Sequence, residues 1–340
     1  MQADRKRDGR NLPLGLFLAV FPFLCLFFSL ALGQYEIPVK DVGRILLARF
    51  FTLEPDWSPV AETLLLHVRI PRALGAMLIG AGLASSGAAF QGLFRNPLAS
   101  PYTLGVSNGA GFGAAFAILL AGGVHSIFLT ALSFGLAAVA LTFVLCMGSK
   151  NSTVTLVLGG VIVGAFFAAL ISLLKYVADP LEKLPSIVFW LMGSLATLKG
   201  SLLLAALPPY LSGMAILLLY RWRLNLLALG DDEAASFGIN VRRDRMIVIL
   251  CCTLVTATAV SIAGIIGWVG LVIPHLGRIL VGPDFRRLLP ACISLGASYL
   301  LLIDDVCRAT ITTEIPLGVV TALIGTPIFA YFMIRRKVNW

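Results

Sequence analysis

Long stretches without a single charged residue constrain this chain more than any other feature. No Asp, Glu, Lys or Arg occurs within 12–33, 73–94, 96–149, 151–174, 200–220, 246–277, 288–303 or 315–334. A helix that crosses a bilayer needs about 20 apolar residues, and several of these stretches are long enough for one or two. Because 59% of the residues are hydrophobic and only 13% are charged, a water-soluble fold of this size could not bury the apolar surface. The pattern predicts an all-α, polytopic membrane protein.

The apolar stretches divide into ten expected helices. We place them at 12–33, 68–93, 103–120, 125–148, 153–176, 201–220, 244–263, 268–281, 288–305 and 316–335. Ten spans put both termini on one side of the membrane, and that side then holds 17 of the 26 Lys and Arg residues. The positive-inside rule therefore predicts cytoplasmic termini. The same rule accounts for the net charge of +9, so we expect no nucleic-acid partner.

The N-terminal run and the cysteines add two further expectations. The apolar run at 12–33 is longer than the apolar region of a cleaved signal peptide, so we expect a retained first helix. Five of the six cysteines lie inside apolar stretches, and none forms a C-x-x-C pair. We therefore expect small buried side chains at these positions, with no disulfide framework and no metal site.

Catalytic and energy-coupling motifs are missing from the sequence. It has no G-x-x-x-x-G-K-[ST] motif, so the chain cannot bind ATP phosphates in a Walker loop. The uncharged stretches hold no carboxylate to carry a proton, which argues against a proton-coupled transporter. The three histidines are far apart in sequence, which disfavours a membrane enzyme and any resident cofactor. Either a partner supplies the energy, or the chain is a passive channel.

Small residues and irregular segments indicate how the helices pack. Gly105, Gly109 and Gly113 recur at four-residue spacing, and small residues let helix backbones approach closely in lipid. We expect a tightly packed bundle. The segments 95–101 and 264–283 contain too many Gly and Pro residues for regular spans.

Motifs spread along nearly the whole chain resemble one family. They are Ile70-Pro71-Arg72, Gln91, Arg95 to Ala99, Pro101, Leu104-Gly105, Ser107 to Ala110, Leu229 to Gly238, Gly267 to His275 and Glu314 to Ala322. In this order they resemble the type II ABC-importer permeases for ferric siderophores, haem and vitamin B12. One departure is Trp268, where the family usually has Phe.

The resemblance implies a fold and a set of partners. It implies one permease domain over 1–340, with a fold like that of the vitamin B12 permeases, in the cell inner membrane. The expected partners are a second permease copy, two cytoplasmic ATPase subunits that hydrolyse the ATP, and a periplasmic substrate-binding protein. The expected cargo is a ferric siderophore or haem; cobalamin and molybdate are alternatives, and a passive channel is a distant one.

The loop at 221–245 contains a candidate coupling helix. Asp231 can cap a short helix, acidic residues suit its N-terminus, and Gly238 suits its C-terminal stop. From the residues alone, an ordinary surface turn is the alternative. The resemblance implies that this helix docks into the ATPase through Asp231, Asp232, Glu233, Ala234, Ala235, Phe237 and Gly238.

The resemblance also implies a gate and a pathway. Pro97 biases Asn96 away from helical geometry, and Ser152 or Thr153 can cap the helix that follows. Simple helix caps are the alternative. The implied gate consists of Asn96, Leu98, Ser152 and Thr153, and the implied pathway lining of Gly160, Gly164, Ala168 and Ser172.

Three arginines on the expected periplasmic side are candidate docking residues. Arg69 and Arg72 share a face at the expected start of the second span, and Arg308 lies in the expected loop after the ninth. Interfacial anchoring by extended side chains is the alternative. The resemblance implies that these arginines receive glutamates of the binding protein, in the bidentate geometry that guanidinium groups favour.

Overall fold

The computed structural model describes residues 2–147, 153–309 and 314–335, with side chains from Pro13 onward. Over these residues the chain is helical and contains no strand. The elements are α1 (Gln2–Ala31), α2 (Val39–Leu47), α3 (Pro59–Leu64), the π-helical η1 (Leu65–Arg69), α4 (Ile70–Phe94), α5 (Val106–Leu119), α6 (Val124–Cys146), α7 (Thr153–Val177), α8 (Lys183–Leu191), α9 (Gly200–Leu219), α10 (Arg221–Leu229), α11 (Asp231–Ser236), α12 (Val241–Ala263), α13 (Val269–Val281), α14 (Phe285–Ala309) and α15 (Leu317–Arg335).

Every expected span has a helical counterpart. In the described part of the chain, seven helices are long and apolar enough to cross a membrane, and α5, α13 and α15 are shorter apolar helices. The all-helical multi-pass architecture is therefore confirmed, while ten crossings and cytoplasmic termini stay predictions.

Three expected boundaries were wrong. The first helix begins at Gln2, not residue 12. The second begins at Pro59, because Ser58 caps its N-terminus and Pro59 suits the first helical position. It continues through η1 into α4 as one 36-residue rod. The ninth helix, α14, extends to Ala309.

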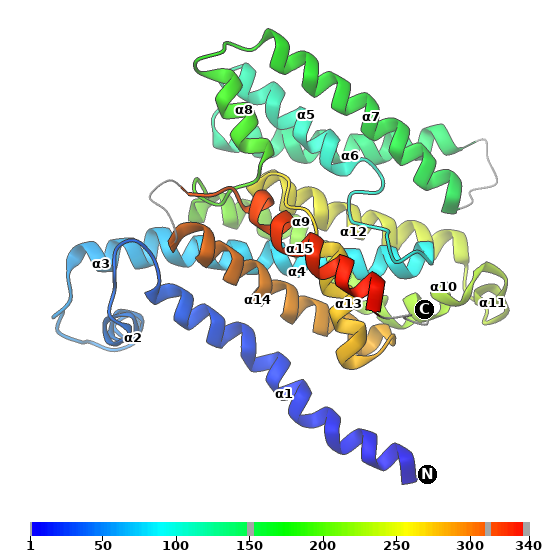
Figure 1. Cartoon of the computed structure of the whole chain (residues 1–340), viewed down its shortest axis with the longest axis horizontal. Helices are drawn as coiled ribbons and strands as arrows, with labels where there is room; N and C mark the ends of the chain where they lie inside the picture. Colours follow the sequence, from blue (N-terminus) through cyan, green and yellow to red (C-terminus); the bar gives the residue numbers. More distant parts are fainter. Residues whose placement is uncertain (1, 148–152, 310–313, 336–340) are drawn as a thin grey trace.

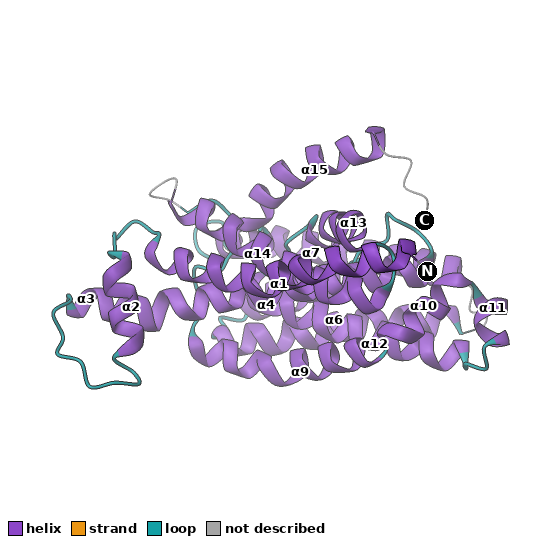
Figure 2. Ribbon diagram, turned by 90° about the horizontal axis from the view of Figure 1, so that it is seen from below, coloured by secondary structure: helices purple, strands orange, loops and turns teal. Residues whose placement is uncertain are grey.

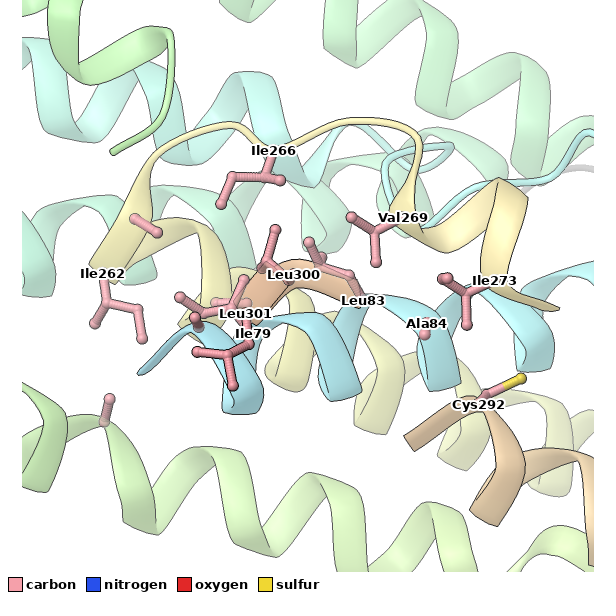
Figure 3. Packing of buried hydrophobic residues seen from close by; sticks show 14 of the residues in the cluster. Ile79, Leu83, Ala84, Ile262, Ile266, Val269, Ile273, Cys292, Leu300 and Leu301 are labelled. Carbon is pink, nitrogen blue, oxygen red and sulfur yellow. The ribbon is translucent and has the colours of Figure 1, made fainter. Parts of the chain in front are cut away.

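Helix α4 forms the centre of the molecule and packs against α14, α12 and α13. A Cβ atom on Gly80 would lie 2.1 Å from the carbonyl oxygen of Gly296, and one on Gly87 would lie 2.1 Å from that of Gly270. Figure 3 shows Leu300 of α14 beside Leu83 of α4. The predicted close packing of small residues is confirmed at these crossings.

Helices α5, α6, α7 and α8 form a second group, drawn above the central helices in Figure 1. A Cβ atom on Gly109 would lie 2.5 Å from the carbonyl oxygen of Phe134, and one on Gly113 would lie 2.3 Å from that of Thr130. These contacts bring α5 and α6 together, and α12 connects this group to the centre through its contacts with α5 and α6.

The two ends of the bundle differ. The start of α1, the end of α15, and helices α10 and α11 lie at one end, which we call the terminal end. Helices α2 and α3 lie at the other, which we call the α2 end. Figure 2 shows α15 leaning away from the other helices, and its contacts are with α13 and α14.

Candidate transport and coupling sites

The candidate coupling helix is a separate element, α11, at the terminal end. Gly230 precedes it with φ of +140°, a conformation that glycine adopts readily. Gly230, not Asp231, is therefore the N-cap residue, which corrects the expected capping role. The side chain of Asp231 instead pairs with Arg245 of α12. Gly238 has φ of +79° and its N–H donates to the Ala235 carbonyl, so it ends the helix as predicted.

One face of α11 is anchored and the other is open. Ala234 is fully buried, whereas Asp232, Glu233, Ala235 and Phe237 are exposed. The Phe237 side chain is 62% exposed. The open face is therefore a short apolar ridge rimmed by carboxylates.

Polar contacts join α10 to α12 and to the start of α14 below α11. Arg223 of α10 donates to both carboxylate oxygens of Asp244 of α12 at 2.7 Å, and Asp244 has no exposed surface. Asn225 of α10 donates to Asp284 at 2.7 Å and accepts from the N–H of Phe285. Hydrogen bonds from Arg286 lower the pKa of Asp284 to about 2, so this carboxylate stays ionised.

The candidate gate begins where α4 ends, as predicted. Arg95 has φ of +49°, a left-handed conformation that is uncommon for a residue with a side chain. The Asn96 side chain accepts the N–H of Leu98 at 2.9 Å. Asn96 and Leu98 are exposed. Thr153 is the first residue of α7, and Ser152 lies outside the described residues.

Three elements brace the segment between α4 and α5. Gly105, with φ of +80°, lies against the backbone of Gly160 and Gly164 in α7. The hydroxyl of Tyr102 donates to the carbonyl of Ile266 at 2.5 Å, and Pro101 lies against Gly270. The segment is therefore fixed to both helix groups.

The start of this segment also adjoins the coupling helix. A Cβ atom on Gly230 would lie 3.1 Å from Nη1 of Arg95 and 2.5 Å from Oε2 of Glu233. The last residue before the candidate gate and the first turn of α11 therefore share one small space. A displacement of α11 would therefore also displace the Arg95 side chain.

Of the four expected lining residues of α7, two are buried and two are exposed. Gly160 and Gly164 are buried. Gly160 lies against Thr103 and Leu104 of the α4–α5 segment, and Asn108 of α5 donates to the Gly164 carbonyl at 2.9 Å. The small size of both glycines permits this close packing, and their expected lining role stays a prediction. Ala168 and Ser172 are exposed, and the Ser172 hydroxyl donates to the Ala168 carbonyl.

The three candidate docking arginines are buried at the α2 end, with exposures of 6–8%. Arg72 makes a bidentate pair with Asp304, with N–O distances of 2.9 to 3.1 Å, and also contacts Glu314 at 2.6 Å. Arg308 lies in the last turn of α14, not in a loop. It pairs with Asp305 at 2.5 Å. Because α14 continues past residue 305, both carboxylates belong to a helix.

Arg69 has a different role from the other two. It donates to the carbonyls of Leu30, Ala31 and Tyr35. Leu30 and Ala31 end α1, where carbonyls lack helical partners and a cation is favourable. Arg69 therefore fixes the end of α1 against the central rod.

The sequence did not predict that carboxylates of α14 pair with these arginines. Asp304 lies four residues before Arg308, and that spacing predicts an intrahelical pair once the helix is extended to 309. The pairing of Arg72 with Asp304 joins residues 232 positions apart, and no local pattern indicates it. Among the described residues, no three His, Cys, Asp or Glu side chains are grouped as metal ligands.

Comparison with known proteins identifies the family. The model of the FecCD transport family matches residues 20–335. The chain belongs to the FecCD transport family. It is an ABC-importer permease, and the resemblance seen in its motifs is thereby confirmed.

Individual relatives in the FecCD family have different cargoes in their names. The molybdate import system permease protein MolB of Haemophilus influenzae is 44% identical over 310 residues, which is 91% of each chain. The vitamin B12 import system permease protein BtuC of Escherichia coli is 36% identical, covering 97% of this chain and 98% of that protein. A solved structure described as an inward-facing, putative metal-chelate type ABC transporter has a TM-score of 0.86 at 41% identity, covering 95% of this chain and all of that one.

Proposed function

We propose that this chain is the inner-membrane permease of an importer that carries a metal chelate from a periplasmic binding protein into the cytoplasm. It works as a dimer with two ATPase subunits, and the ATPases, not this chain, hydrolyse ATP. The observation that carries the proposal is the exposed ridge of α11, at the end that holds most Lys and Arg residues. Asp231, Asp232, Glu233, Ala235 and Phe237 form the docking surface, with Ala234 and Gly238 as its supports.

The exposed faces of α7 and α15 support a dimer. Leu158 and Ile162 of α7 are 57% and 63% exposed, and Leu323 of α15 is 70% exposed. Lipid can cover such faces, but α15 also leaves the bundle (Figure 2), as an element held by a second copy would. Ala168 and Ser172 then face the central pathway.

The gate consists of Asn96, Leu98 and Thr153, together with Ser152 from the sequence pattern. Its coupling to the ATPase passes through Arg95, which lies beside Gly230 and Glu233 of the coupling segment. An ATPase that moves α11 thereby moves the end of α4.

The first candidate cargo is a ferric siderophore or haem, and cobalamin belongs to the same bulky class. Ala168 and Ser172, both exposed on α7, are small and uncharged, which suits a bulky cargo that must leave as easily as it enters. Molybdate is a second candidate, favoured by the 44% identity to a molybdate permease. An uptake assay with haem, a ferric siderophore, cobalamin and molybdate distinguishes them.

The coupling proposal is tested by Ala235→Arg. A charged side chain on the ridge should abolish transport and ATPase stimulation while leaving the permease folded. Ala196→Arg is the matched control, since Ala196 is exposed in the α8–α9 connection, away from α11. Survival of both activities in Ala235→Arg, at the level of the control, would refute the coupling role.

A further inference from the structure

A groove between α1 and α14 is the starting observation. Helix α1 moves away from the bundle as it approaches the N-terminus (Figure 1), and a cavity of about 580 Å³ opens between the two helices. Its apolar walls include Leu14, Leu18 and Phe23 of α1 and Pro290, Ala291 and Ala297 of α14. The groove lies among spans, so an apolar occupant from the bilayer can enter it.

The polar groups inside this groove satisfy one another. Pro22 has no N–H to donate to the Leu18 carbonyl four residues earlier. The hydroxyl of Ser294 donates to that carbonyl instead. The middle of the groove therefore has no polar group that requires a ligand, which favours a hydrocarbon chain there.

The groove is cationic where it approaches the terminal end of the bundle. Arg286 and Arg287 line it, and no acidic residue does. Arg286 also contacts Asp284, which lies outside the lining. Within the described part of the chain, Arg287 has no carboxylate within ion-pair distance. Both arginines occupy the first turn of α14, where the helix dipole disfavours cations and favours an anion. A bound anion would therefore be stabilised by the two guanidinium groups and by the helix terminus.

The length of the groove matches half a bilayer. Arg286 and Ala297 are eleven residues apart on one helix, which corresponds to about 16 Å of rise. The hydrocarbon core is about 30 Å thick, so a chain beginning at the arginines would end near its centre. The charge and the length together select an amphiphile with an anionic head and one leaflet's length of hydrocarbon.

We propose that the α1–α14 groove binds an anionic phospholipid of the cytoplasmic leaflet, with its phosphate at Arg286 and Arg287 and one acyl chain along α14. The sequence of α1 adds Arg5, Lys6, Arg7 and Arg10, against Asp4 and Asp8, just before the groove-lining residues. Net basic segments near the membrane surface attract anionic lipid. The lipid fills the space between α1 and the bundle. Lipid binding in this groove does not depend on the cargo or on the ATPase.

The test measures lipid retained by the purified, delipidated full-length protein in native mass spectrometry. With dioleoylphosphatidylglycerol we expect one lipid held per chain, and at least about tenfold less with dioleoylphosphatidylcholine at the same concentration. Arg286→Gln and Arg287→Gln should each weaken retention about fivefold. Arg242→Gln, an exposed arginine at the start of α12, is the matched control and should retain the lipid.

A second variant tests the groove without touching the arginines. A Cβ atom on Gly15 meets nothing within 4 Å, so Gly15→Phe fills the groove without a clash and should reduce retention at least tenfold. Gly43→Phe, in similarly open space on α2, should have no effect. Three results would overturn the proposal: equal retention of both lipids, unchanged retention in Gly15→Phe or in both arginine variants, or displacement of the lipid by millimolar inorganic phosphate alone.

Discussion

Asp304→Asn tests whether the buried ion pairs hold the α2 end together. The Asp304 side chain has no exposed surface and accepts three close N–H contacts from Arg72. Removing one partner of a buried pair costs about 3–5 kcal/mol, since it leaves a buried charge uncompensated. Arg72 retains Glu314 at 2.6 Å, so the lower figure of about 3 kcal/mol applies. At about 2 °C for each kcal/mol in a large chain, the thermal midpoint should fall by about 6 °C.

The assay is thermal unfolding of the detergent-purified protein, followed by loss of the monodisperse peak. Asp232→Asn is the matched control, because Asp232 is exposed on α11, and it should shift the midpoint by less than about 1 °C. The double variant Arg72→Leu, Asp304→Leu should recover part of the loss, because the buried Arg72–Asp304 pair is then replaced as a whole; only Glu314, whose side chain is 30% exposed, loses its partner. A midpoint for Asp304→Asn equal to that of Asp232→Asn would refute the reasoning.

Three further predictions concern the helix packing, the candidate gate and the loop before α14. Gly80→Ala should lower the thermal midpoint by several degrees, because a Cβ atom 2.1 Å from the Gly296 carbonyl forces α4 and α14 apart. Such overpacking costs about 1–3 kcal/mol. Gly267→Ala is the control: its Cβ atom would meet nothing within 4 Å, so the midpoint should stay unchanged. A cysteine at Asn96 should crosslink to its copy in one nucleotide state only, and crosslinking in every state would remove the gating role. The lowered pKa of Asp284 contributes stability that is complete above about pH 4 and is lost as pH falls toward 2, so wild type and Asp284→Asn should converge in stability over that acidic range.

Most of the helical architecture could be predicted because lipid imposes strong rules. A span must be about 20 residues long and largely uncharged, so charge-free stretches locate the helices. The rules fail where a helix extends beyond the apolar core. The second helix begins nine residues earlier than expected, at Pro59. This extension was not predicted because it contains the polar residues Glu62, His67 and Arg69.

The candidate site could be predicted only where local chemistry determines it. Gly238 and the break after Phe94 were predictable, since glycine and proline act on their own backbone. The roles of Gly160 and Gly164 were not, because glycine in a membrane helix serves packing and a pathway equally well in sequence. The neighbours of Gly160 come from the α4–α5 segment, more than 50 residues away, and only the fold brings them together.

The buried arginines change how docking of a binding protein at the α2 end must be understood. For Arg72 to receive a carboxylate from another protein it would have to release Asp304, and the loss of such a pair costs about 3–5 kcal/mol. Exchange of partners is therefore unfavourable, and a docking carboxylate would have to join the cluster without displacing its members. Arg69 is constrained similarly, because leaving the Leu30 and Ala31 carbonyls would free the end of α1. The contacts of these three arginines hold the α2 end of the structure together. Docking of a binding protein here would have to leave these contacts intact.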